Sequence, residues 1–164
     1  MRLGLIAVGQ LKNGPERDLV ERYRGRFDGH ARYLGIGALE LIELSESRAK
    51  REGDRRVEEA KHILGRVPDG ALVAFDERGG ALTSPAFASR LALWRDGGSP
   101  GVSCMIGGPD GLADSVRKRA DLVVSFGALT LPHQLVRVLV VEQLYRSLTI
   151  LSGHPYHRAG GDEI

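Results

Sequence analysis

Short apolar runs alternate with helix-forming segments five times along the chain. The runs are mostly unbroken by polar residues, which is typical of strands buried on both faces of a parallel sheet. They cover residues 3–9, 38–44, 71–76, 101–107 and 121–126. Each run is followed by a segment with apolar residues at helical spacing. This repeat predicts an α/β fold, a mostly parallel sheet with helices on both faces.

The helix-forming segments carry terminal signals of their own. The expected helices follow Pro15, precede Gly65, start at Ser84, and span about 112–120 and 134–148. Ser84 has the chemistry of an N-cap, with Pro85 at the first helical position. The last helix has almost no polar face, so it must be buried by its own core or by another subunit.

Length and composition favour one soluble domain. The 164 residues match a single domain, and 42% hydrophobic with 27% charged residues is ordinary for a globular core. No apolar run approaches the ~20 residues that span a bilayer, and the opening MRLGLIAVGQ is too short for a signal peptide. A cytoplasmic protein is expected, with one domain over 1–158 and a disordered tail over 159–164. Cys104 lies in an apolar run and is expected to be a small buried hydrophobe.

Three strand ends lead into unusual loops. The runs ALVAFD, VSCMI and LVVSF continue into ERGGALTS, GGPDG and GALTLPH. Ligands of open parallel sheets bind beyond the carboxyl ends of the strands. Gly107 and Gly108 are expected to let the backbone approach a ligand, and Gly127 with Ala128 to present backbone amides. These loops predict a pocket. Because GxGxxG and GxxxxGK[ST] are both missing, it is neither a Rossmann dinucleotide site nor a P-loop.

Two groups of polar residues are candidates for chemistry. Arg137 follows His133 by one helical turn and is expected to meet the GALTLPH loop, where it either satisfies loop carbonyls or contacts an anion or substrate. In the terminal GHPYHR, Tyr156 could stack on an RNA base and Arg158 could hold phosphate. A His-x-x-His pair without acidic or cysteine ligands is a weak zinc signal, so no metal is expected. The net charge of +2 permits an RNA partner without indicating one.

These motifs together resemble a known family. LIAVG near the start, IGGPDG, ALTLPHQLVRVLVVEQLYR and the terminal HPYHR are similar, in order and spacing, to the small bacterial pseudouridine N3-methyltransferases of 23S rRNA, of the SPOUT class. The resemblance covers the chain up to the AGGDEI tail. It implies a C-terminal trefoil knot, S-adenosylmethionine bound in that knot, and a homodimer. It also implies a pseudouridine substrate in 23S rRNA of the 70S ribosome, with no membrane or DNA partner.

The resemblance also assigns cofactor contacts to particular positions. These are Phe75, Gly107, Gly108, Phe126, Gly127, Ala128, Leu129, Thr130 and Leu131. The family commonly has an aliphatic residue where Phe75 stands, and often Ser or Leu around 126–127. Asp110 replaces a frequent Glu. These departures are expected to change loop packing and to leave the polar chemistry intact.

The reaction that the resemblance implies depends on aligning the methyl donor with the target base, and not on covalent catalysis by the protein. The sulfonium is already an activated electrophile, whereas N3–H of pseudouridine must lose its proton at or before methyl transfer. Arg137 is predicted to stabilise or orient the anionic base. His133, Tyr156 and His157 are candidates for positioning the base or relaying the proton, and Arg158 for a phosphate contact.

Two alternatives stay open at this point. A SPOUT-like enzyme could instead modify tRNA or a ribose 2′-hydroxyl, although the terminal HPYHR argues against that. A non-catalytic ribosome-binding factor could use the same pocket, although it would not need intact cofactor loops.

Overall fold

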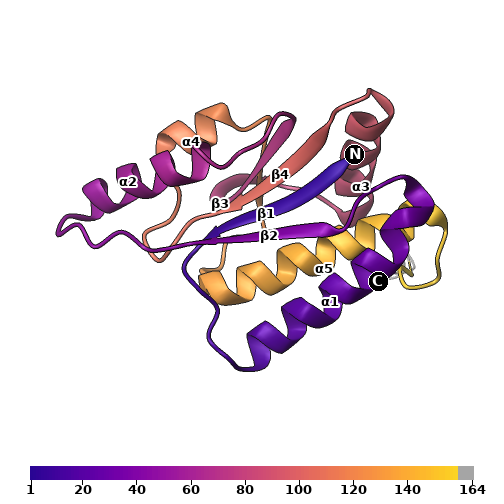
Figure 1. The fold of residues 1–164 in the computed structure, drawn as a ribbon, viewed down its shortest axis with the longest axis horizontal. Helices are drawn as coiled ribbons and strands as arrows, with labels where there is room; N and C mark the ends of the chain where they lie inside the picture. The colour runs from indigo at the N-terminus through magenta and orange to yellow at the C-terminus, as the bar shows by residue number, and fades with distance from the viewer. Residues whose placement is uncertain (159–164) are drawn as a thin grey trace.

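Five parallel strands form one sheet in the order β2-β1-β4-β3-β5 (Figure 1). The computed structural model describes residues 1–158, so the tail expected over 159–164 lies outside the described residues. All four strand pairs are parallel, which confirms the predicted α/β class. The strands are β1 (Arg2–Val8), β2 (Leu39–Leu44), β3 (Ala71–Ala81), β4 (Gly101–Ile106) and β5 (Leu122–Ser125).

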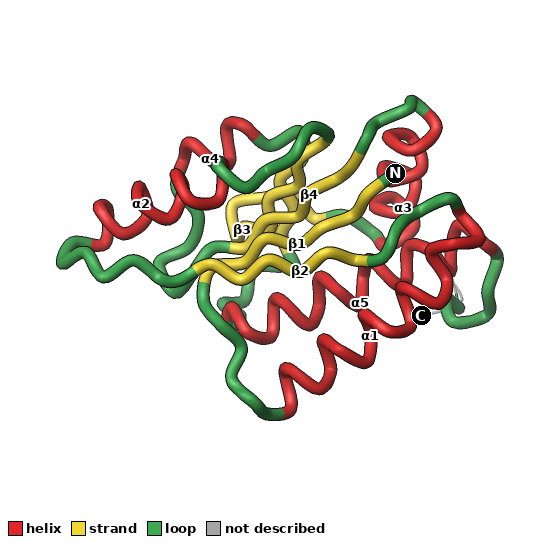
Figure 2. The backbone as a smooth tube through the Cα atoms, in the orientation of Figure 1, coloured by secondary structure: helices red, strands yellow, loops and turns green. Residues whose placement is uncertain are grey.

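The helices cover both faces of the sheet. They are α1 (Pro15–Ala31), η1 (a 3₁₀ turn, Arg32–Leu34), α2 (Glu52–Leu64), α3 (Ser84–Asp96), α4 (Asp114–Arg119) and α5 (His133–Ser152). The chain moves toward the β2 edge through α1 and α3, and toward the β5 edge through α2 and α4. Right-handed crossovers therefore place these pairs on opposite faces, and Figures 1 and 2 show α1 and α5 across the sheet from α2 and α4. No helix within residues 1–158 could cross a membrane.

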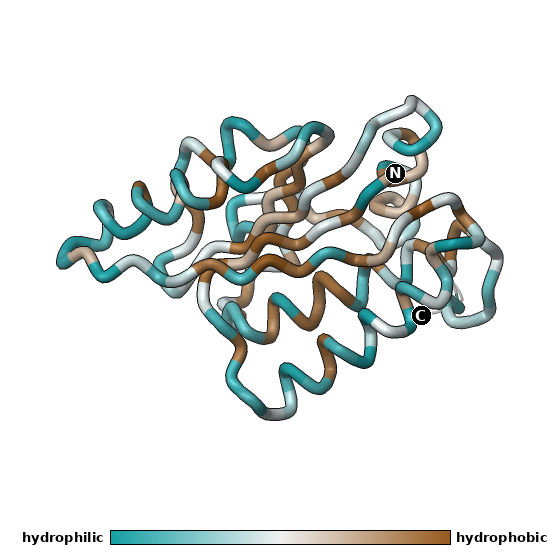
Figure 3. Tube along the Cα trace, in the orientation of Figure 1, coloured by the Kyte–Doolittle hydropathy of each residue, from teal (hydrophilic) through white to brown (hydrophobic). Residues whose placement is uncertain are grey.

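The core lies on both sides of the central strands. One apolar cluster joins the sheet to α1, α3 and α5, and a smaller one joins it to α2 and α4. Every residue of β4 is buried, and the strands are the most hydrophobic part of the trace in Figure 3. Cys104 on β4 is fully buried as predicted, and burial raises the pKa of its thiol to about 12.

Most of helix α5 is buried in the core of the subunit, and part of one side is exposed. Val141, Leu144 and Leu148 are completely buried within the subunit, so the apolar stripe on this side needs no partner. Leu135 and Leu139, one turn apart, stay 42% and 36% exposed. The helix therefore presents a short apolar strip near its start, while burial in its own core accounts for the missing polar face along the rest of its length.

Two boundary predictions were wrong. Strand β3 continues beyond residue 76 to Ala81, with its pairing to β5 shifted between Phe75 and Gly80. The cap of α3 is Thr83, whose Oγ1 accepts a hydrogen bond from the Ala86 N–H at 3.3 Å. Ser84 instead donates to Gln143 on α5 at 2.7 Å, a long-range partner that a local capping pattern does not reveal.

Candidate cofactor-binding and active site

A cavity of about 520 Å³ opens at the carboxyl ends of β3, β4 and β5. Parallel strands end at one edge of a sheet, so the three loops meet there as the sequence predicted. The volume lies in the range typical of small-molecule sites. The lining includes eight of the nine predicted cofactor residues and His133; Ala128 does not line it.

The Gly107–Gly111 loop forms the floor between β4 and α4. A Cβ on Gly107 would lie 2.5 Å from the Gly111 carbonyl carbon, so a side chain there would collide with the loop itself. The Gly111 N–H donates to Gly108 O at 2.9 Å and closes the turn. A Cβ on Gly108 would meet Val8 Cγ1 at 3.0 Å and Glu59 Oε2 at 3.4 Å. Packing against β1 and α2 is therefore a further reason for glycine at 108, beside the close approach of a ligand and the tight bend that the sequence suggested.

Aromatic stacking fixes one wall of the cavity. Phe75 at the register shift of β3 stacks on Phe126 with ring centroids 5.3 Å apart, and meets Phe87 of α3 edge-on at 6.0 Å. Just beyond, Gly127 has φ +121°, a backbone conformation that favours glycine. The Ser125 hydroxyl accepts from the Gly127 N–H at 3.1 Å and donates to its carbonyl at 3.0 Å. The Ser125 side chain therefore fixes the backbone at the start of this loop, before the chain enters α5.

Ion pairs tie the cavity walls to one another. Arg117 of α4 donates to Asp76 at 2.9 Å, and both side chains are largely buried. Arg55 of α2 makes a two-point bond with Asp110 at 2.6 and 3.0 Å, and this hydrogen bonding lowers the pKa of Asp110. All of these except Arg55 line the cavity, so groups of both charge signs face it.

Sequence reasoning missed these charged residues. Asp76 carried a usable signal, because it directly follows a buried strand at the edge where ligands bind. Arg117 and Arg55 carried none, because their partners lie 41 and 55 positions away.

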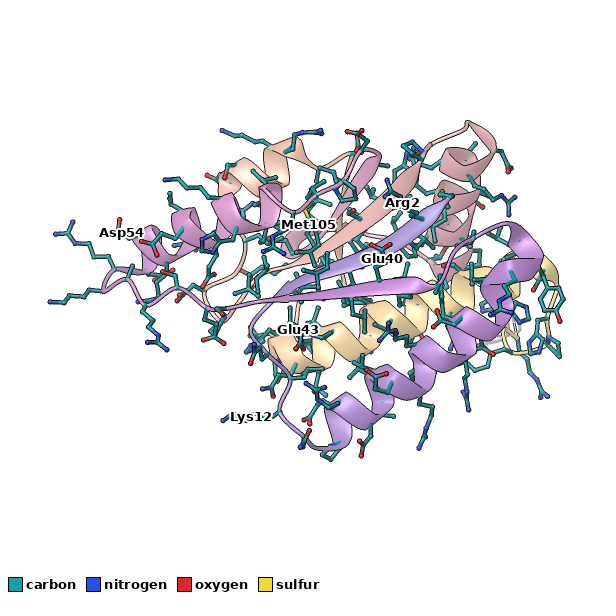
Figure 4. The ribbon with its side chains drawn as sticks, viewed as in Figure 1. Arg2, Lys12, Glu40, Glu43, Asp54 and Met105 are labelled. Carbon is teal, nitrogen blue, oxygen red and sulfur yellow. The ribbon has the colours of Figure 1, made fainter. Side chains whose placement is uncertain are left out.

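Arg137 is buried where α5 packs against the ends of β1 and β2, and it does not make the expected contact with the GALTLPH loop. Its guanidinium pairs with Glu43 of β2 at 2.5 Å and donates to the carbonyls of Gly9 at 2.9 Å and Val8 at 3.3 Å. Burial lowers the pKa of Arg137, although Glu43 opposes this shift. Figure 4 shows Glu43 near the start of α5. Arg137 therefore satisfies carbonyls after β1, not those of the GALTLPH loop, and it does not line the 520 Å³ cavity.

The C-terminal candidates lie at the other end of α5. The Tyr156 ring packs on Tyr145 with centroids 4.7 Å apart and under the Arg146 guanidinium at 4.8 Å. Its hydroxyl donates to Glu142 at 2.9 Å, and burial raises its pKa. His157 Nδ1 lies 3.4 Å from Arg146 Nη1. Tyr156 is thus engaged within its own subunit, and the expectation of a ring free to stack on a base is not met.

Arg146 donates to Glu142, one helical turn earlier on α5, at 2.6 and 2.9 Å. Arg158 is exposed. Within residues 1–158 no group of three or more His, Cys, Asp or Glu side chains is placed to hold a metal ion.

These features agree with the comparison to known proteins. The chain matches the family model described as predicted SPOUT methyltransferase over residues 1–157, and it belongs to that family. It is 62% identical over 159 residues to the ribosomal RNA large subunit methyltransferase H of Methylobacterium sp. (strain 4-46), covering 96% of this chain and 98% of that protein.

Further matches extend the comparison. The protein of the same description from Rhodopseudomonas palustris (strain HaA2) is 57% identical over 160 residues, covering 97% of this chain and all of that one. Among solved structures, a probable methylase family protein from Haemophilus influenzae Rd KW20 aligns with a TM-score of 0.48 and 13% identity, covering 96% and 70% of the two chains.

Proposed function

We propose that this protein uses S-adenosylmethionine to methylate N3 of a pseudouridine in 23S rRNA of the assembled ribosome. The observation that carries the proposal is the meeting of the predicted cofactor loops around one cavity in a SPOUT family chain. The relatives with 62% and 57% identity, described as acting on large-subunit ribosomal RNA, support the substrate class. The work of such an enzyme on ribosomes also supports a cytoplasmic location.

The residues around the cavity fit this cofactor. S-adenosylmethionine, when bound, supplies a methyl group on a sulfonium together with an amino group, a carboxylate and a flat adenine. The cavity offers apolar side chains, loop backbone and charges of both signs, which together match a ligand of that mixed character. We assign its binding to Phe75, to Gly107 and Gly108, and to the segment 126–131.

His133 is the catalytic candidate that lines the cavity. We propose that its imidazole positions the target base or accepts the N3 proton, since an imidazole nitrogen can accept either a hydrogen bond or a proton. Arg137 lies one turn further along and fixes Gly9, while a Cβ on Gly9 would come within 3.7 Å of His133 Nε2. Arg137 then acts by orientation, through the backbone next to His133, rather than by direct contact with the anionic base.

The active site is proposed to be shared between two subunits. Helix α5 has 20 residues, which separates its ends by about 30 Å. Tyr156, His157 and Arg158 follow that helix and do not line the cavity of their own chain, so we propose that they join the cavity of a partner. A dimer supplies that arrangement.

Exposed leucines at the start of α5 support the dimer. Leu135 and Leu139 are 42% and 36% exposed, and Leu129 in the cavity loop is 84% exposed. Exposed leucines one turn apart on a helix are a candidate surface for association with a second copy. Leu144, completely buried within the subunit, is not part of this proposed interface. Close packing of α5 against both α1 and α3 is compatible with the trefoil knot that the resemblance implies, which we include in the proposal.

Cationic side chains near the C-terminal ends of α1 and α5 support an RNA contact. Arg22 and Arg26 lie on the outer face of α1, one turn apart, and Tyr33 just beyond them is 84% exposed. His154 meets His30 of α1 edge-on with ring centroids 5.0 Å apart, which brings the segment before Arg158 to the same end. Arginine can hold phosphate and an exposed tyrosine can stack on a base.

The test is methyl transfer from tritiated S-adenosylmethionine to 70S ribosomes, free 50S subunits or tRNA, followed by nucleoside analysis. We expect label in N3-methylpseudouridine from 23S rRNA of 70S ribosomes. Label in tRNA or on a ribose would support the first alternative. Cofactor binding without any transfer would support a non-catalytic ribosome-binding factor.

A further inference from the structure

Glu59 is a buried carboxyl directly under the Gly107–Gly111 loop. It lies on α2 with 4% of its surface exposed. Its Oε1 accepts a hydrogen bond from the Ser47 N–H at 2.9 Å. Its Oε2 has no hydrogen-bond partner among residues 1–158. That oxygen would lie 3.4 Å from a Cβ on Gly108, so it faces the part of the loop that was assigned to the cofactor.

A second contact joins α2 to the same loop. Arg55, one helical turn before Glu59, holds Asp110 through the two-point bond described above. Planar two-point pairs fix geometry as well as charge. Helix α2 therefore contacts the loop at both of its ends, through Asp110 and beneath Gly108. A change at Glu59 therefore acts on a loop that is also held to α2 through Asp110.

The surroundings of Glu59 disfavour its charged form. Burial raises the pKa of its carboxyl, the hydrogen bond from Ser47 lowers it, Asp110 and Glu46 raise it further, and Arg55 lowers it. An ionised Glu59 would leave Oε2 negative and without a donor, beside the negative Asp110. Protonation removes that charge and leaves a neutral O–H without an acceptor, which costs less to bury than an unpaired carboxylate charge.

We propose that Glu59 is a positioning residue for cofactor binding, whose neutral carboxyl supports the Gly107–Gly111 loop and whose ionisation loosens that loop. The inference rests on the proposed function for the identity of the ligand. Because the neutral carboxyl supports the loop that binds the cofactor, affinity for S-adenosylmethionine is present at low pH. It is lost as pH rises through the pKa of Glu59.

The experiment measures the Kd of S-adenosylmethionine by calorimetry for wild type, Glu59→Gln and Glu59→Ala. The range is about pH 5.5 to about pH 9, which spans the values documented for buried carboxyls. Glu59→Gln keeps the shape of the side chain and is neutral at every pH. The wild-type Kd is expected to increase as pH rises, so the ratio of the Gln variant's Kd to the wild-type Kd falls. The ratio changes about tenfold if the pKa of Glu59 differs by one unit between free and bound protein. Glu59→Ala binds more weakly at every pH.

Asp54→Asn is the matched control. Asp54 lies on the same helix, is exposed, and projects into solvent in Figure 4. The same loss of a carboxylate there leaves the Kd and its pH dependence as in wild type. Parallel pH curves for wild type and Glu59→Gln would overturn the proposal and leave Glu59 a purely structural residue.

A direct titration of Glu59 in the wild-type chain by carbon-13 NMR, with and without S-adenosylmethionine, covers the case in which a variant does not fold. The pKa of Glu59 is expected to be higher in the bound protein. An unchanged pKa would contradict the proposal. Failure of the wild type to bind S-adenosylmethionine at any pH would instead refute the proposed function.

Discussion

Replacing Arg137 by methionine should destabilise the protein severely. The side chain is 3% exposed and holds Glu43 and the carbonyls of Val8 and Gly9. Methionine fills similar space but removes the donor to the Val8 and Gly9 carbonyls and the positive charge beside Glu43, which keeps only the hydrogen bond from the Leu11 N–H at 3.0 Å and a longer contact with Arg17 at 3.8 Å. Removing one member of a buried ion pair typically costs about 3–5 kcal/mol, which is a large share of the roughly 5–15 kcal/mol that stabilises a typical domain. For a chain of this length the loss corresponds to a fall in Tm of roughly 6–20 °C.

The measurement is thermal unfolding at fixed protein concentration, because binding between subunits makes Tm concentration-dependent. Arg22→Met is the control: Arg22 is exposed and makes no ion pair within residues 1–158, so the cost should stay within about 0.5 kcal/mol. Arg137→Lys should fall between the two, since an ammonium keeps the charge but not the planar fork. A variant with methionine at 137 that melts like wild type yet transfers no methyl group would refute this reasoning. It would restore Arg137 as a direct substrate contact.

Three further predictions concern assembly and the C-terminus. The expected dimer has a mass of about 36 kDa, twice 17.8 kDa. Leu139→Glu should convert it into monomer, as measured by light scattering, whereas Leu93→Glu on α3 should not. A monomeric wild type would contradict the proposed interface. Truncation after Ser152 should leave the S-adenosylmethionine Kd within several-fold and lower methyl transfer to ribosomes by orders of magnitude; full activity would remove the tail from the site. Arg158→Ala should raise KM for ribosomes with a shallower salt dependence, by about one phosphate contact; an unchanged salt slope would argue against that contact.

The loops that line the cavity were accessible from the sequence because the signals are local. In VSCMIGGPDG an apolar run is followed directly by two glycines, so adjacent residues predict both the buried strand and the bend that ends it. Parallel pairing then places all such loops at one edge. The structure accordingly brings Phe75, Gly107 and Thr130 around one cavity. The order of the strands was not predictable in this way, since apolar runs of similar composition can pair in several orders.

What the sequence alone determined about this protein is its α/β class, the positions of its strands and the loops that form the cavity. These follow from burial patterns and turn chemistry within a few residues. Only the tertiary structure decided how polar groups are paired. Arg137 meets Glu43 across 94 positions of sequence, and Tyr156 lies against its own α5 instead of standing free. Glu59 reaches the loop beneath Gly108. A buried polar group needs a hydrogen-bond partner. Its partner is set by which distant elements pack together in the fold, and a local sequence pattern does not contain that information.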